Sequence, residues 1–176
     1  MEKKFVIELK NVKFYSSLSR ETYCFQCDIL VNGVKSFYAD NDGHGGNTCI
    51  SNYVKCQFSY KEIDNYFKSL PKKKFQDFEY EQTFESAVDD LFNDWLIEND
   101  KKKLNKKIDK LMFDNIVYQT TNKEDLRCLF WKDNTKKNVA IEKLLSIPKF
   151  NKIVMDKVEE LKSQGYIILN TNIPNI

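Results

Sequence analysis

The sequence predicts an α+β protein, in which an N-terminal antiparallel β-meander packs on a long helix, with further helices and short strands C-terminally. Three observations support this prediction. Apolar residues alternate with polar ones in the first third of the chain, a pattern typical of half-buried strands. In the middle third they recur every three or four residues, a pattern typical of helices. The last third contains short stretches of both patterns.

The first third predicts three strands in a meander. Residues 5–14 are rich in β-branched and aromatic side chains, and residues 22–31 alternate so that one face is apolar. Asn32-Gly33 is then the strongest short signal for a hairpin turn, and residues 34–39 form the returning strand. A glycine-rich loop, residues 40–48, leaves from the far end of that strand.

The middle third predicts two helices. Ser59-Tyr60-Lys61-Glu62 has the spacing of a capping box, and Pro71 ends the apolar stripe that follows it. A long helix begins near Thr83. Its buried face is expected to consist of residues spaced 4-3-4, namely Phe84, Val88, Leu91 and Trp95. Asn99-Asp100 interrupts this stripe, so the helix ends there or continues through Leu104, Ile108 and Leu111.

The remaining elements are shorter. Lys72-Lys73-Lys74 is expected to be a linker. The last third predicts strands at 115–120, 126–132 and 166–169 and helices at 139–147 and 150–164, with Gly165 as the C-cap residue of the second helix. The length favours one domain over residues 1–176. Its parts are β-rich (1–58), helical (59–112) and mixed (113–176).

Composition narrows the classes of protein. The chain is 41% apolar and 14% aromatic, which supplies a core and argues against disorder. A net charge of +2 gives only weak attraction of the whole molecule to nucleic acid or membrane. No stretch approaches the ~20 apolar residues of a membrane span, and the N-terminus lacks the apolar block of a signal peptide. Five cysteines without framework spacing are expected as reduced thiols. These features predict a cytoplasmic location.

The loop at residues 40–48 is the most unusual segment. It holds three of the five glycines and the only histidine within four consecutive residues. Glycine is favoured where φ is positive or where another group approaches closely. The loop therefore either contacts a ligand or partner, or is a structural turn in which Asp42 and Asn47 bond their own backbone. The candidate binding residues in it are Asp40, Asp42, Gly43, His44, Gly45, Gly46 and Asn47.

Asp40, Asp42 and His44 also allow a metal site. They are two residues apart, so in an extended segment they project to one side, and carboxylates and imidazole bind Mn, Fe or Zn. A metal-dependent phosphoesterase or nuclease is therefore an alternative function, in which a carboxylate from residues 89–98 can complete the ligand set. An EF-hand in this register fails, because Ser51 stands where the bidentate Glu is required. The glycines match neither phosphate-binding fingerprint.

Other chemistry finds little support. Cys24 and Cys27 have the spacing of zinc ligands, but three residues apart in a strand they face opposite sides, so we expect buried thiols. Any Ser-His or Cys-His arrangement must use His44, which flanking glycines hold poorly as a general base. No catalytic residues and no cofactor are therefore assigned.

Charge is segregated around the long helix. Phe75–Asp100 holds nine acidic residues and no basic ones, and six lysines follow within residues 101–110. The acidic half allows a phosphate-mimicking surface. The basic half allows nucleic-acid binding through Lys101, Lys102 and Lys106. A solvated helix explains the same pattern, because early acids and late lysines complement the helix dipole.

Two segments together resemble a known group. Ser17-Leu18-Ser19-Arg20-Glu21-Thr22, then Asn32-Gly33, then Asn41-Asp42-Gly43-His44-Gly45-Gly46 resemble small uncharacterised proteins encoded by phages and mobile elements. The match covers about residues 5–50, and the ending Ile168-Leu169-Asn170-Thr171-Asn172 belongs to the same pattern.

The resemblance implies a setting, and no activity is known for the group. Phage accessory proteins commonly bind and inhibit host defence machinery. The expected function is therefore non-enzymatic binding through the glycine-rich loop in the host cytoplasm. The expected partner is a CRISPR-type nuclease or other effector, or a signalling nucleotide. Arg20 and Glu21 are further candidates, although their loop can lie at the opposite end of the sheet.

Overall fold

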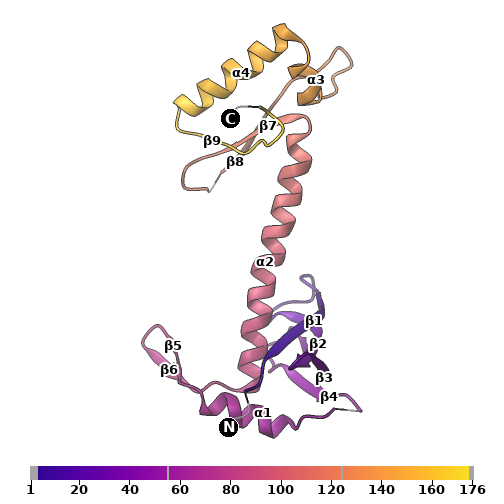
Figure 1. Cartoon of the computed structure of the whole chain (residues 1–176), viewed down its shortest axis with the longest axis vertical. Helices are drawn as coiled ribbons and strands as arrows, with labels where there is room; N and C mark the ends of the chain where they lie inside the picture. The colour runs from indigo at the N-terminus through magenta and orange to yellow at the C-terminus, as the bar shows by residue number, and fades with distance from the viewer. Residues whose placement is uncertain (1–3, 55, 124, 175–176) are drawn as a thin grey trace. The chain divides into compact units, whose positions relative to one another are not determined.

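The computed structural model describes residues 4–54, 56–123 and 125–174. They form two compact units, Met1–Ile97 and Glu98–Ile176, and the boundary falls within one long helix, α2 (Phe84–Met112) (Figure 1). The α+β prediction is confirmed, since an antiparallel sheet is followed by helices and short strands. The prediction of a single folding domain stays a prediction. No helix in the described ranges has the length and apolar character to cross a membrane.

The first unit begins with a four-stranded antiparallel sheet in sequential order (Figure 1). Its strands are β1 (Ile7–Phe14), β2 (Cys24–Val31), β3 (Val34–Asp42) and β4 (Cys49–Asn52). Asn32 and Gly33 have φ of 51° and 80°, as the tight hairpin turn requires. The predicted meander is confirmed. The fourth strand was missed because its four residues show no clear alternation.

Helix α1 (Tyr60–Ser69) begins at the predicted capping box, where the Ser59 amide donates to the Glu62 carboxylate at 3.3 Å. The linker prediction for residues 72–74 is wrong. Lys73–Phe75 forms β5, which pairs with β6 (Phe78–Tyr80). Gln76 adopts φ 54° between the two strands, which lets the chain turn tightly and pair.

The core of the first unit lies between the sheet and α2. Phe84, Val88 and Phe92 of the helix are buried together with apolar residues of β2 and β3. Phe92 stacks on Phe25 with ring centroids 3.9 Å apart. The prediction of Leu91 as the third core residue is off by one position, because the stripe is spaced 4-4 here. Trp95 packs against the core while remaining partly exposed, as judged from its intermediate burial.

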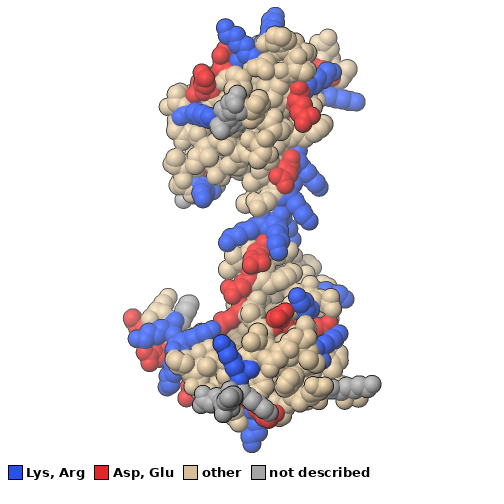
Figure 2. All heavy atoms as spheres, in the orientation of Figure 1, with Lys and Arg blue, Asp and Glu red and all other residues tan. Residues whose placement is uncertain are grey.

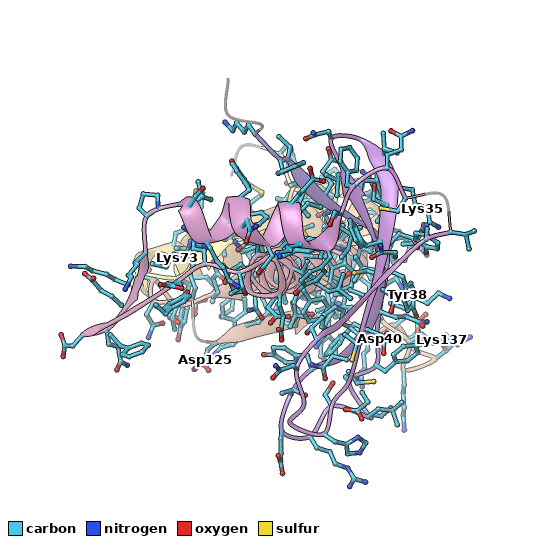
Figure 3. All side chains as sticks on the ribbon, turned by 90° about the horizontal axis from the view of Figure 1, so that it is seen from below. Lys35, Tyr38, Asp40, Lys73, Asp125 and Lys137 are labelled. Atoms are coloured by element: carbon cyan, nitrogen blue, oxygen red, sulfur yellow. The ribbon has the colours of Figure 1, made fainter. Side chains whose placement is uncertain are left out.

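The face of the sheet turned away from α2 is polar, and Figure 3 places Lys35, Tyr38 and Asp40 on that side. Asp28 is buried there at 7% exposure. Its carboxylate accepts hydrogen bonds from Asn11 Nδ2 at 2.7 Å, from Lys35 Nζ at 2.8 Å and from the Tyr53 hydroxyl. Burial alone would raise the pKa of Asp28, but these bonds outweigh it and lower the pKa to about 2.

The second unit contains the rest of α2, which continues through Asn99-Asp100 to Met112. Its later elements correspond to predicted ones: β7 (Asn115–Gln119), β8 (Leu126–Phe130), α3 (Ile141–Leu145), α4 (Pro148–Ser163) and β9 (Ile167–Ile168). The strands form a second antiparallel sheet in the order β8-β7-β9. An aliphatic core joins this sheet to α3 and α4. Gly165 has φ 85° after α4, as a C-cap glycine does.

Candidate functional site

Two loops meet at one end of the first sheet, and we call residues 15–23 and 43–48 the paired loops. Cys24 pairs with Asp42, so the loop before β2 and the loop after β3 are adjacent. The backbone N–H groups of Arg20, Glu21 and Thr22 all point to the Gly43 carbonyl, at 3.0, 3.2 and 3.4 Å. The concern that Arg20 and Glu21 lie at the opposite end of the sheet is therefore wrong.

Asn41, a residue that the sequence did not single out as a candidate site residue, organises the paired loops. Its Oδ1 accepts from Gly43 N and from Thr22 Oγ1, both at 2.9 Å. Its Nδ2 donates to the Gly46 carbonyl at 3.0 Å. Thr22 Oγ1 in turn accepts from Gly45 N at 3.2 Å. One buried amide thereby fixes both loops. The turn is Asx-organised as the structural alternative predicts, with Asp42 accepting from His44 N as expected, but Asn41 takes the role that the sequence assigned to Asn47.

The three loop glycines have different reasons to be glycine. Gly43 has φ 85°, and a Cβ there would lie 2.6 Å from the Leu18 carbonyl oxygen. Gly45 has φ 88°, and a Cβ there would collide with the Glu21 carboxylate. These two serve the close approach of the neighbouring loop. Gly46 has nothing within 4 Å of an added Cβ, so it borders open space and is available to a partner.

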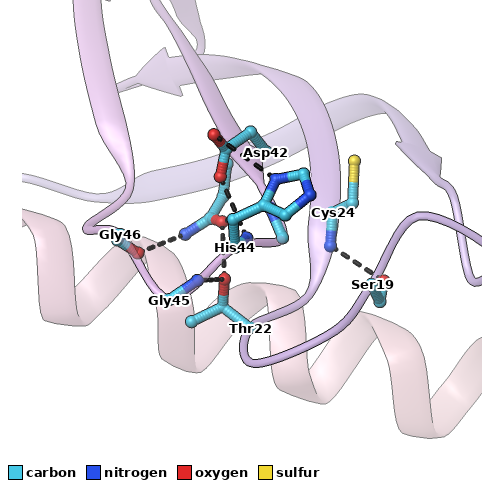
Figure 4. Close-up of polar contacts among 9 residues, drawn as sticks. Ser19, Thr22, Cys24, Asp42, His44, Gly45 and Gly46 are labelled. Atoms are coloured by element: carbon cyan, nitrogen blue, oxygen red, sulfur yellow. Dashed lines mark hydrogen bonds and ion pairs between the residues drawn. The ribbon is translucent and has the colours of Figure 1, made fainter.

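The predicted metal ligands are not brought together. His44 is exposed; its backbone N–H donates to Asp42 Oδ1 at 3.0 Å, and its Nδ1 lies 3.7 Å from Asp42 Oδ2 (Figure 4). Asp40 lies within β3, where its backbone pairs with Cys49 of β4. Among residues 4–54, 56–123 and 125–174, no group of three His, Cys, Asp or Glu side chains is arranged to hold a metal ion.

A cleft of about 760 Å³ opens between the paired loops and the first turns of α2. Thr48 joins its two walls. The Thr48 amide donates to Glu85 Oε1 at 3.0 Å, and Thr48 Oγ1 donates to Asp89 Oδ1 at 2.6 Å. Glu85 and Asp89 are one helical turn apart, so both carboxylates face the loops. Sequence reasoning missed Glu85 and considered Asp89 only as a further metal ligand, because the contacts with Thr48 span 37 and 41 residues.

The cleft is acidic. Three carboxylates line it, from Glu21, Glu85 and Asp89, against one cation, Arg20. Burial raises the pKa of Asp89, the Thr48 hydrogen bond opposes that rise, and the charge of Glu85 adds to it. Tyr23, which is 48% exposed, forms part of the wall. The arrangement is suited to accepting hydrogen bonds from a cation. The described residues that line it include neither histidine nor cysteine.

The other sequence candidates lie elsewhere. Asn47 lines the cleft, whereas Lys101, Lys102 and Lys106 are exposed on α2 in the second unit. Cys24 and Cys27 are buried in β2, as predicted, and burial raises the pKa of the Cys27 thiol to about 12. A thiol in that state is a poor metal ligand.

No protein-family model, curated protein or solved structure shows significant similarity to this chain. The fold and the site themselves define its class: an α+β protein with an acidic cleft at the paired-loop end of its first sheet.

Proposed function

We propose that this protein acts by binding, and that a basic side chain of a partner protein enters the acidic cleft. The observation that supports this most directly is the pair of carboxylates, Glu85 and Asp89, held side by side by Thr48. Each accepts one hydrogen bond from Thr48 through one oxygen. The second carboxylate oxygens can accept from a guanidinium or ammonium group, which forms charge-assisted bonds.

The paired loops favour binding because hydrogen bonds within the chain already hold their backbone. Hydrogen bonds from Asn41 and Thr22 fix the backbone of residues 43–46. A surface that is already fixed loses less conformational entropy on association. The cleft volume falls within the range of ordinary ligand sites. The exposed ring of Tyr23 can also make a cation–π contact with such a basic side chain.

Electrostatics selects between the two expected kinds of partner. A signalling nucleotide would place its phosphates against three carboxylates, which repel them. A protein with a basic surface meets complementary charge. CRISPR-type effectors hold nucleic acid in positively charged channels, and the resemblance to phage-encoded proteins supports a host defence component of this kind. Inhibition would then follow from occupying a basic surface that the effector needs.

The test compares variants of the cleft as baits. Glu85→Gln and Asp89→Asn keep the Thr48 hydrogen bonds while removing the charges, and Gly46→Arg places a bulky cation at the open glycine. We expect a host protein that wild type retains from lysate to bind at least tenfold more weakly to each variant when purified. Isothermal titration at about 0.15 M salt gives the affinities.

Gln57→Arg, an exposed position outside the cleft lining, is the matched control for Gly46→Arg. It should bind the partner as wild type does. Circular dichroism of every variant verifies the fold. If no purified host protein distinguishes Gly46→Arg and Asp89→Asn from wild type, the cleft is not the binding site.

A further inference from the structure

The second unit carries a charged surface that the cleft does not use. Four lysines of α2 define it, and we call them the lysine face: Lys103, Lys106, Lys107 and Lys110. All four are exposed. Figure 2 shows basic side chains crowding along this part of α2, after the acidic segment that precedes it. Within Glu98–Ile176 basic residues outnumber acidic ones by five.

The spacing of the lysine face makes it one continuous stripe. Positions 103, 106, 107 and 110 follow the i, i+3, i+4, i+7 pattern, which confines them to an arc of about 100° on a helix. Seven residues of helix span about 10 Å. One strand of nucleic acid presents about three phosphates over that length. The charge spacing of the stripe is therefore close to that of a phosphate backbone.

Few acidic groups neutralise these lysines. Lys103 Nζ lies 3.4 Å from Asp100, and neighbouring Lys102 lies 3.7 Å from Glu98. Both pairs are exposed and therefore weak. No ion pair within 4 Å is found for Lys106, Lys107 or Lys110 in the described part of the chain. A polyanion would not have to displace strong internal partners.

An aromatic side chain lies on the sheet beside the lysine face. Phe130 of β8 is 46% exposed, and Lys132 Nζ lies 5.4 Å from its ring centroid. Phe130 pairs with Asn115, and Asn115 Nδ2 donates to the Leu111 carbonyl at 2.8 Å. The Phe130 end of β8 therefore lies next to the last turn of α2, which carries Lys110.

We infer that the lysine face and Phe130 form a binding site for single-stranded nucleic acid. The lysines contact consecutive phosphates, and the Phe130 ring stacks on an unpaired base. An exposed ring next to lysines favours this ligand over an anionic lipid surface, because an unpaired base offers a flat π-face to stack on together with a phosphate charge. The site is independent of the acidic cleft, so either can fail alone.

The experiment measures anisotropy of labelled oligo(dT) and oligo(U), each about 12 nucleotides long, with the full-length protein. About three phosphate contacts predict a slope near −2 in log affinity against log salt, hence a loss of roughly 20-fold between 50 and 200 mM KCl. The two oligonucleotides distinguish DNA from RNA. Changing all four lysines to Gln should abolish detectable binding, and Phe130→Ala should weaken it fivefold or more while leaving the salt slope unchanged.

The matched control changes four other exposed lysines of the second unit to Gln, namely Lys137, Lys143, Lys149 and Lys152. It alters net charge equally and should leave most of the binding intact. Equal losses in both quadruple variants would overturn the proposal, since binding would then follow net charge alone. Preference for anionic vesicles over oligonucleotides, or affinity that does not change with salt, would also overturn it.

Discussion

The cores of the two units are built from different side chains. In the first unit, phenylalanines dominate the buried cluster, with Phe25, Phe37, Phe84 and Phe92 packed between sheet and helix. In the second, every fully buried member of the cluster is aliphatic: Ile116, Ile141, Leu144, Val154, Val158, Leu161 and Ile173. Large rings bury more area per residue and fill the space between the sheet and the helices α1 and α2. Two short helices on a small sheet are filled by smaller side chains.

The units also differ in net charge, but they share one structural feature. Acidic residues outnumber basic ones by three in Met1–Ile97, whereas the second unit is basic. Each unit has a buried asparagine that ties separate segments: Asn41 in the first, and Asn170 in the second, where it accepts from Val117 N at 2.6 Å. Each unit thus has its own core and its own polar anchor, and the two units carry opposite net charges.

The largest expected effect is a cavity in the first core. Phe92 stacks with Phe25 and contacts Phe14, Tyr23 and Trp95. Phe92→Ala should destabilise the protein by about 3–5 kcal/mol. If the two units are stabilised separately, hydrogen exchange measured by mass spectrometry should rise within residues 4–97, with little change at β7 and α4.

Ile116→Val makes the corresponding cavity in the second core and should lower the free energy of unfolding by about 1 kcal/mol. Hydrogen exchange should then rise at β7 and α4, with little change within residues 4–97. Equal acceleration of exchange in both units by Phe92→Ala would show one cooperative domain, as the sequence predicts, and would remove the distinction between the units.

The next effect depends on pH. The pKa of Asp28 is lowered to about 2, so its carboxylate stabilises the first unit above the unfolded pKa near 4. That contribution, about 2 kcal/mol, is lost as pH falls from about 4 to about 2. Asp28 is the only buried carboxylate in the described ranges, so acid should loosen the first unit before the second. Urea unfolding of Asp28→Asn should show a reduced dependence on pH in this window.

Substituting two glycines with the same φ separates the cost of steric crowding from the cost of backbone strain. Gly43 and Gly165 both have φ 85°, but only at Gly43 would a Cβ meet other atoms, 2.6 Å from Leu18 O and 2.9 Å from Cys24 Cβ. Gly165→Ala should cost about 1 kcal/mol, the backbone penalty alone. Gly43→Ala should cost about 1–3 kcal/mol more. Equal costs in chemical denaturation would show that the paired loops are loosely packed.

Periodicity predicted the elements of both units but could not predict the contacts between distant ones. The stripe beginning at Phe84 located α2, with an error of one position at Leu91 because neighbouring Phe92 is equally apolar. The adjacency of Arg20 and Gly43 could have been predicted, since the Asn32-Gly33 hairpin places the start of one strand beside the end of the next. The Thr48 contacts with α2 could not, because they depend on how the helix docks.

The smallest expected effect on stability comes from removing one partner of each of two ion pairs that share the i,i+4 spacing. In the first unit, Lys68 Nζ lies 2.7 Å from Asp64, whose side chain is 14% exposed and also accepts from Phe84 N at the start of α2. Burial alone would raise the pKa of Asp64, but these two hydrogen bonds outweigh burial, so the pKa lies below its usual value. In the second unit, Lys102 lies 3.7 Å from Glu98, and both side chains are about 70% exposed. Asp64→Ala should therefore cost about 1 kcal/mol through the lost helix cap and pair, whereas Glu98→Gln should cost at most about 0.3 kcal/mol. Thermal unfolding at low and high salt checks both, because salt should reduce the Glu98 effect to nothing and leave most of the Asp64 effect, which is geometric capping rather than exposed charge attraction.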